Sequence, residues 1–424
     1  MPRGRPGDDA GVSAEDLLAG PRGRRLLLEY AVRVDEAGRV DESGRGEPEE
    51  ADRSAAGENH PALDPRQAGV EEPSLQSMVW SAAHALDPDR DRARPYGEFD
   101  ASWDRLSYER HLAGPTPGWA APTPDEVAAR LAGLRLTEAS HETLVFALAD
   151  AAAFALYWQE PDGADALAAT GVVREGLRRV AEHLATSPLI RAWSAPASPA
   201  GQAVVRWPDE DASDQRSARE ALLAWRADQV DAEARAARET PRDPAAAPGG
   251  DWTSTPPWHC LRSTRRLSDG APAGLYTVED DWGCHRAEVR ALIPSRPVRL
   301  YEIDGPGAWA RLCREFPLAM TAEKRCNWYL TTGRDGRWVV PDWSRVAEHW
   351  DAVHLTTAAY LAAAGTAIAV DAAAASVIAG WNPDETIWLT DAASCGDDVE
   401  RWGRDADGED LTWRPVESAA DDAA

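Results

Sequence analysis

A stretch rich in proline, glycine and alanine, residues 240–251, divides the chain into two parts with different hydrophobic patterns. Proline and glycine disfavour regular structure, so this composition is typical of a linker. Before it, apolar residues recur every three to four positions, which predicts amphipathic helices. After it, short runs with β-type composition alternate with short helical patterns. We therefore expect an α+β protein, with a mainly α-helical N-terminal domain followed by a mixed α+β C-terminal domain.

The N-terminal part divides further by composition. Residues 1–20 are rich in Gly, Asp and Pro and are expected to form a disordered tail, apart from a short turn near Leu17. Residues 21–239 are expected to form the helical domain. Its plainest helical stripe consists of Val173, Leu177, Val180 and Leu184. Residues 33–60 carry almost no apolar side chain and cannot bury enough surface to offset chain entropy, which predicts a disordered insert.

The C-terminal part is expected to form a Trp-rich α+β domain over residues 252–390. Helices are expected to begin at Pro306, Pro341 and Thr357. The predicted strands are residues 274–278, 298–303, 337–340, 352–355, 366–370, 376–379 and 386–389. Residues 391–424 hold eleven acidic residues against three arginines, and we expect a loosely attached acidic tail there.

Charge and composition exclude several classes of protein. A net charge of −27 argues against nonspecific binding to nucleic acid or to an anionic membrane. No run approaches the ~20 apolar residues that span a bilayer, and no apolar run follows the basic residues at the start. The five cysteines have no CxxC spacing, which favours reduced thiols. We expect a cytoplasmic protein; its residue bias indicates a GC-rich genome, and the chain resembles proteins of actinobacteria.

Several motifs that would identify a reaction are missing. The only lysine, Lys324, does not belong to a GxxxxGK[ST] loop, and neither GxSxG nor HExxH occurs. His349 and His354 are separated by an expected break between helix and strand at Asp351, so we predict no metal site. His354 remains a candidate catalytic general base oriented by a carboxylate. The alternative is a core histidine whose nitrogens are satisfied.

Tryptophan is concentrated after the linker, where 12 of the 19 tryptophans lie. These rings could stack on a nucleotide or dock a protein partner. They could equally fill the core of a chain that has only 4 phenylalanines. Trp258 and Trp282 flank polar residues in expected loops and are the strongest candidates for exposed rings.

Residues 258–264, Trp-His-Cys-Leu-Arg-Ser-Thr, are followed by Gly-Leu-Tyr at residues 274–276. A Trp-His strand end, a short gap and a Gly-Leu-Tyr strand resemble the opening of ADP-ribosyltransferase-like domains. The resemblance implies that His259 holds the ribose of NAD and that Tyr276 lines the nicotinamide pocket. It also implies a late carboxylate beside the oxocarbenium-like centre, and Glu385 precedes a late predicted strand. The sequence departs from the family at Leu261, where many members have Ser or Thr.

Two hypotheses follow from these residues. In the first, the C-terminal domain is a NAD-dependent ADP-ribosyl transferase or NAD glycohydrolase, with NAD as a candidate substrate and no cofactor assigned. Glu385 and His354 would then be catalytic, and Arg262 or Arg265 would meet the pyrophosphate. In the second, the protein is a non-catalytic interaction or regulatory protein with a Trp-rich docking surface. One pocket shared by His259, Tyr276 and Glu385 would favour the first hypothesis, and an exposed Trp patch the second.

Overall fold

The computed structural model describes residues 11–44, 73–88, 121–208, 216–245, 249–281, 283–405 and 411–416. Its helices are α1 (Ala14–Ala19), α2 (Pro21–Gly44), α3 (Leu75–Leu86), α5 (Pro124–Gly133), α6 (His141–Ala153), α7 (Gly163–Ala169), α8 (Gly171–Ala185), α9 (Pro188–Ala192), α10 (Ala218–Glu239), α11 (Pro306–Glu315), α12 (Thr321–Thr332), α13 (Trp343–Val346) and α14 (Thr357–Ala363), with a 3-10 turn η1 (Ala273–Leu275). Its strands are β1 (Ala203–Arg206), β2 (Arg262–Thr264), β3 (Arg286–Pro294), β4 (Leu300–Ile303), β5 (Pro317–Ala319), β6 (Arg337–Pro341), β7 (Ala352–Leu355), β8 (Ile368–Ala369), β9 (Ala374–Ser376), β10 (Glu385–Trp388), β11 (Ala393–Gly403) and β12 (Arg414–Pro415). The predicted α+β class is confirmed.

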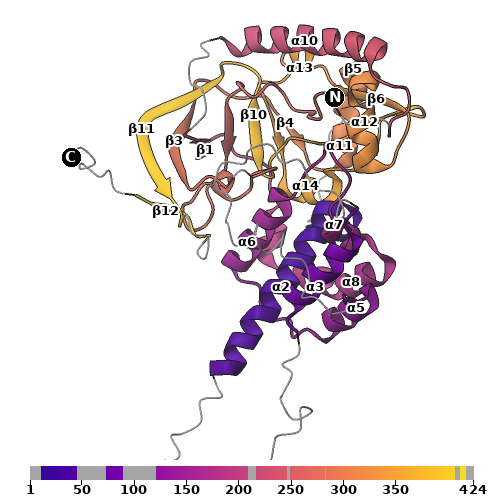
Figure 1. The fold of residues 1–424 in the computed structure, drawn as a ribbon. Helices are drawn as coiled ribbons and strands as arrows, with labels where there is room; N and C mark the ends of the chain where they lie inside the picture. Colours follow the sequence, from indigo (N-terminus) through magenta and orange to yellow (C-terminus); the bar gives the residue numbers. More distant parts are fainter. Residues whose placement is uncertain are drawn as a thin grey trace, which may run out of the picture.

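Figure 1 shows the N-terminal helices α2, α3, α5 and α8 together on one side of the larger sheet, with α10 along the opposite side. Local sequence explains several of these helices. Capping boxes begin α1 at Ser13, α5 at Thr123 and α10 at Ser217. The predicted stripe of α8 is buried as expected. In the described residues, no helix is both long enough and apolar enough to cross a membrane.

The larger sheet has eight strands in the order β12–β11–β3–β1–β2–β10–β7–β4. Its neighbours pair antiparallel, except that β4 and β7 are parallel. A smaller sheet has the order β5–β6–β9–β8. β1 lies between β3 and β2, although it precedes residues 240–251 and the other strands follow them. The larger sheet therefore takes strands from both sides of the predicted linker.

The main hydrophobic core also continues across this stretch. It joins Leu26 and Leu177 from the N-terminal helices to Trp343 and Trp381 from the C-terminal part. The end of the predicted linker is bonded to α12, because the Asp251 N–H donates to Glu323 Oε1 at 3.0 Å. The predicted division into residues 21–239 and 252–390 is therefore not confirmed.

Two N-terminal segments expected to be disordered are partly helical. In the 1–20 tail, where only a short turn near Leu17 was expected, α1 forms a helix and buries Leu17 and Leu18. The expectation of disorder over residues 33–60 was also wrong in part, because residues 33–44 continue helix α2. The physical reason is pairing of its polar groups: Asp35 is buried, lies 2.5 Å from Arg130 Nη2 and accepts the Leu75 N–H at 2.8 Å. Residues 1–10 and 45–60 lie outside the described residues.

Two C-terminal expectations also need correction. Residues 274–278 do not form a strand; η1 covers residues 273–275 and leads into Tyr276. The segment from residue 391 is not a loose tail up to Gly403, because β11 pairs with β3 from Ala393↔Pro294 to Gly403↔Arg286. Backbone pairing with β3 on one side and β12 on the other holds this segment in the sheet even though it is acidic. The last residues, 417–424, lie outside the described residues.

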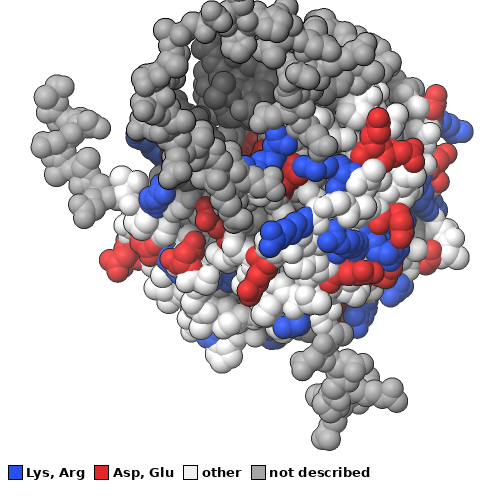
Figure 2. Space-filling view, turned by 90° about the horizontal axis from the view of Figure 1, so that it is seen from below, with Lys and Arg blue, Asp and Glu red and all other residues white. Residues whose placement is uncertain are grey.

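Charged side chains of both signs are interspersed over the face of the N-terminal helices, which Figure 2 shows from below. Arg178 Nη1 lies 2.5 Å from Glu15 Oε1 and joins α8 to α1 on this side. Exposed pairs of this kind stabilise a fold only slightly. The net negative charge of the chain therefore does not leave this face uniformly acidic.

Candidate functional site

Four of the six predicted site residues lie on or beside three neighbouring strands of the larger sheet. Arg262 lies on β2, Glu385 on β10 and His354 on β7, and Arg265 follows β2 directly. In the register, His354 is opposite Thr386, the residue after Glu385. Side chains alternate along a strand, so Glu385 and His354 point to opposite faces of the sheet. The predicted residues therefore separate into two ion-paired groups.

The first group contains Glu385 and Arg262. Arg262 Nη1 lies 2.7 Å from Glu385 Oε2, and the Asn382 Nδ2 group donates to Glu385 Oε1 at 3.1 Å. Glu385 is only 7% exposed, whereas a quarter of the Arg262 side chain reaches the surface. Burial raises the pKa of Glu385, and the nearby Arg262 and Asn382 oppose this rise. The result is a buried carboxylate beneath a partly exposed guanidinium.

The second group is centred on His354, whose side chain is 1% exposed. Its Nδ1 is bonded to Glu302, and its Nε2 lies 3.2 Å from Asp384 Oδ1. Burial acts to lower the pKa of His354, but the hydrogen bonds to Asp384 and Glu302 outweigh it and the pKa is raised. Both ring nitrogens are engaged, so neither is available to accept a proton from a substrate. This arrangement favours the alternative, a buried histidine whose nitrogens are satisfied.

Arg265 belongs to the same second group. Its Nε donates to Asp384 Oδ1 at 2.6 Å, and its Nη2 donates to the Ala195 carbonyl at 3.0 Å. Arg265 therefore joins the start of β10 to the segment between α9 and β1. Asp384 itself has a φ of 63°, in the left-handed region that few residues other than glycine adopt. Three side-chain partners, Arg265, His354 and Thr264, hold it in this conformation.

The structure places the other two predicted residues elsewhere. His259 is half-buried on a loop, with Nε2 3.1 Å from Arg216 Nη2 and its ring 4.2 Å from that of Trp258. Tyr276 packs in a separate hydrophobic cluster with Val289 and Trp402. Its hydroxyl accepts a hydrogen bond from the Trp413 N–H at 3.1 Å. These hydrogen bonds and ring contacts of His259 and Tyr276 run to Arg216, Trp258 and Trp413.

Residues 380–385, which sequence reasoning used only for Glu385, form a connected segment at this site. Glu279 Oε2 accepts hydrogen bonds from the N–H groups of Gly380 at 2.7 Å and Trp381 at 3.0 Å. The Glu279 N–H in turn donates to Asn382 Oδ1 at 2.8 Å. Sequence reasoning missed Glu279 and Asn382. The Gly-Trp-Asn-Pro-Asp-Glu run was the available signal, because Gly, Asn, Pro and Asp mark irregular backbone.

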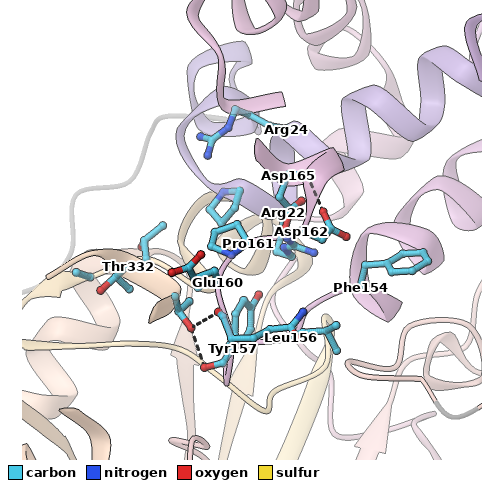
Figure 3. A pocket seen from close by; sticks show the side chains of 16 residues that line it. Arg22, Arg24, Phe154, Leu156, Tyr157, Glu160, Pro161, Asp162, Asp165 and Thr332 are labelled. Carbon is cyan, nitrogen blue, oxygen red and sulfur yellow. Dashed lines mark hydrogen bonds and ion pairs between the residues drawn. The ribbon is translucent and has the colours of Figure 1, made fainter. Parts of the chain in front are cut away.

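A cavity of about 230 Å³ lies at the junction of the N-terminal helices and the C-terminal part (Figure 3). Arg22, Tyr157, Glu160 and Asp165 are among its lining residues, and none of the six predicted site residues is. Arg22 is bonded to Asp165 and donates to the Ala151 carbonyl at 2.8 Å. The Arg22 and Asp165 charges on this wall are therefore already paired with each other.

Most of the C-terminal tryptophans fill the core. The fully buried ones are Trp309, Trp328, Trp338, Trp343, Trp381 and Trp388. Trp258 is 61% exposed, and Trp282 lies outside the described residues. Over the part of the chain that the structure describes, tryptophans therefore do not gather into an exposed patch.

The described residues offer neither a metal-binding cluster nor an activated thiol. No cluster of three or more His, Cys, Asp or Glu side chains there could hold a metal ion. All five cysteines are free, and burial raises the pKa of the Cys260 and Cys313 thiols to about 12. Comparisons of the chain with protein-family models, with curated proteins and with solved structures give no match.

Proposed function

We propose that the protein is an enzyme that cleaves the bond between nicotinamide and ribose in NAD and transfers or hydrolyses the ADP-ribosyl group. The observation that carries this proposal is the 2.7 Å pair of Arg262 and Glu385 on one face of the sheet. The two residues are more than a hundred positions apart. Glu385 was implied by the resemblance to ADP-ribosyltransferase-like domains, and Arg262 was one of the two arginines expected to meet the pyrophosphate. A buried carboxylate beside a partly exposed arginine suits a substrate that carries both a pyrophosphate and a developing positive charge.

In this proposal, the pyrophosphate of NAD binds Arg262 and draws it from Glu385. The bond between ribose C1′ and the ring nitrogen then breaks, and its electron pair leaves with neutral nicotinamide. Positive charge develops on the ribose opposite the Glu385 carboxylate. Water or an acceptor group bonds to C1′ and releases its proton to solvent. The carboxylate thus stabilises the transition state more than the bound substrate.

The other predicted residues take different places in this proposal. His259 is three residues beyond Pro256, whose carbonyl accepts a hydrogen bond from Arg262 Nη2 at 3.4 Å, so its loop borders the proposed site. His354 and Arg265 hold Asp384 on the opposite face. Tyr276 has no role, because its ring is packed in the core. The burial of most tryptophans leaves the docking hypothesis without a specific observation in its favour.

The test compares Glu385→Gln with the full-length wild type, following nicotinamide release from NAD by chromatography and NAD binding by calorimetry. We expect Glu385→Gln to bind NAD and to lose turnover by about 10²-fold or more, as when one preorganised electrostatic group is removed. Arg262→Gln should weaken binding. The control is Glu288→Gln, an exposed carboxylate of β3 in the same sheet. Absence of turnover in the wild type, or equal turnover in Glu385→Gln, would contradict the proposal.

A further inference from the structure

A second buried carboxyl group, that of Glu279, has no role in the proposed reaction, but hydrogen bonds of Asn382 connect residue 279 to Glu385. Glu279 is 8% exposed and accepts two backbone hydrogen bonds, from Gly380 and Trp381. Its position is unusual because the segment it holds has no regular pairing of its own. Gly380 has a φ of 76°, and a Cβ there would lie 2.9 Å from Thr253 Cγ2. Side-chain acceptors must therefore satisfy the N–H groups of this turn.

Asn382 connects the backbone of Glu279 to the side chain of Glu385. Its Oδ1 accepts the Glu279 N–H at 2.8 Å, and its Nδ2 donates to Glu385 Oε1 at 3.1 Å. The Trp381 indole N–H also donates to the Glu385 carbonyl at 3.2 Å. A shift of the Gly380–Trp381 turn would therefore move both the backbone and the carboxylate of Glu385.

The charged and titratable groups around Glu279 come from several elements. Arg22 lies on α2, Tyr157 follows α6, and Tyr360 lies on α14. Asp165 on α7 neutralises much of the charge of Arg22. Burial raises the pKa of Glu279 to about 8, although Tyr360, the Gly380 N–H and Arg22 act to lower it. The carboxyl is therefore mainly protonated at neutral pH and ionises in mild alkali. The nearby cation, Arg22, is already paired with Asp165.

We propose that Glu279 is a positioning residue for Glu385, acting through the turn at Gly380 and Trp381 and through Asn382. The inference rests on the proposed function for the reaction whose rate is measured. The hydrogen bonds between Glu279 and residues 380–382 can be tested by amide exchange, which does not depend on that reaction. The positioning role also gives the N-terminal part a place in the site, because α2 supplies Arg22 and the turn after α6 supplies Tyr157 to the surroundings of Glu279.

The experiment uses Glu279→Ala, which removes the acceptor, and Glu279→Gln, which keeps an acceptor oxygen but cannot ionise. Amide exchange of residues 380–385 is measured by mass spectrometry from pH 6.5 to 9 and corrected for the intrinsic rate at each pH. NAD turnover is measured over the same range. We expect Glu279→Ala to lose protection and to lower kcat about 10-fold or more, with a smaller change in KM, since a displaced catalytic group is costly. Glu288→Gln serves as the control.

The pH profile separates positioning from general stability. The opened segment releases the Glu279 proton at a lower pH than the folded one, so we expect the corrected protection of the wild type to fall as the pH rises to about 8 and to level off above it. Turnover of the wild type should fall as Glu279 ionises, and both quantities should stay level in Glu279→Gln. Identical profiles for these two proteins would overturn the inference, and so would wild-type protection and kcat in Glu279→Ala. If Glu279→Ala does not fold, the Glu279→Gln comparison alone decides. If no protein turns over NAD but the protection changes as expected, the proposed function fails and the positioning of Glu385 stands.

Discussion

Lys324 is the only lysine of the chain, and its side chain is buried. Its Nζ lies 3.0 Å from Asp251 Oδ2 and donates to the Asp251 carbonyl at 2.7 Å. Burial lowers the pKa of Lys324, and Asp251 opposes the effect. The reactivity of this amine therefore reports directly on the packing between α12 and the residues after α10.

We expect an amine-reactive ester to leave the Lys324 peptide unmodified in the native protein and to modify it fully in denaturant. Enclosure excludes the reagent, and both hydrogen bonds must break before the amine can react. Mass spectrometry of the digested protein measures the modified fraction. The positive control is Arg238→Lys on the exposed side of α10, where the introduced amine should react at once. Equal labelling rates at the two positions would show that Lys324 is accessible.

His354 predicts how stability depends on pH. Its pKa is raised in the folded state above the ordinary 6.5, so the folded protein holds this proton more tightly than the unfolded chain. The stabilisation is fully present below pH 6.5 and is lost as the pH rises through the raised value. We therefore expect the difference in unfolding free energy between wild type and His354→Gln to shrink with rising pH, measured by urea unfolding from pH 6 to 9. A difference that grows with pH would contradict this sign.

Among the elements, β11 differs most from what composition suggests. Its acidic residues point outward while Trp402, 6% exposed, packs in the cluster that contains Val289 and Tyr276. We expect Trp402→Ala to lower the unfolding free energy by about 3–5 kcal/mol, the usual cost of emptying a buried aromatic site. The exposed Trp258 is the matched control, and Trp258→Ala should change stability by less than about 0.5 kcal/mol. Denaturant unfolding of both variants makes the comparison; equal effects would mean that β11 is not held in the sheet.

Sequence predicted the elements whose cause is local. α8 has a regular apolar stripe and β7 is a short apolar run, so periodicity and propensity were sufficient. β3 was missed although its buried apolar side chains alternate with exposed Arg and Glu over much of its length, a pattern typical of a half-buried strand. The expectation of disorder for residues 33–44 was wrong because the partners of Asp35 lie on α3 and α5. Information of that kind depends on the tertiary structure.

The same limit applies to the candidate site. The family resemblance pointed to Glu385, and either Arg262 or Arg265 was expected to meet a pyrophosphate; the fold brings Arg262 within 2.7 Å of Glu385. No resemblance pointed to Glu279, because what distinguishes it is its burial and the two hydrogen bonds that it accepts from backbone N–H groups. A carboxylate in the Thr-Val-Glu-Asp-Asp run looks like an exposed turn residue by composition. Only the packing of α14 and the N-terminal helices around it makes it unusual.

At the scale of the whole molecule, the N-terminal and C-terminal parts depend on each other. β1 pairs with β3 from Ala203↔Ala291 to Arg206↔Glu288, and it also joins β2. α10 reaches the other side of the sheet (Figure 1), where the Glu233 carboxylate accepts the Ala322 N–H at the start of α12. Both elements precede the stretch that the sequence indicates as a linker. A chain beginning after that stretch would lack a central strand of the larger sheet.

This dependence predicts the outcome of cutting the linker. Arg242 is exposed and lies beyond the end of α10, so trypsin should cleave there in the native protein. We expect the two fragments to remain together on size-exclusion chromatography, because strand pairing and a shared apolar core hold them without the peptide bond. The fragment beginning at Trp252, expressed alone, should fail to give a cooperative unfolding transition, because β3 and β2 would be separated by an unfilled strand position. Elution of that fragment as a folded monomer would instead establish an independent C-terminal domain, with β1 dispensable to its sheet.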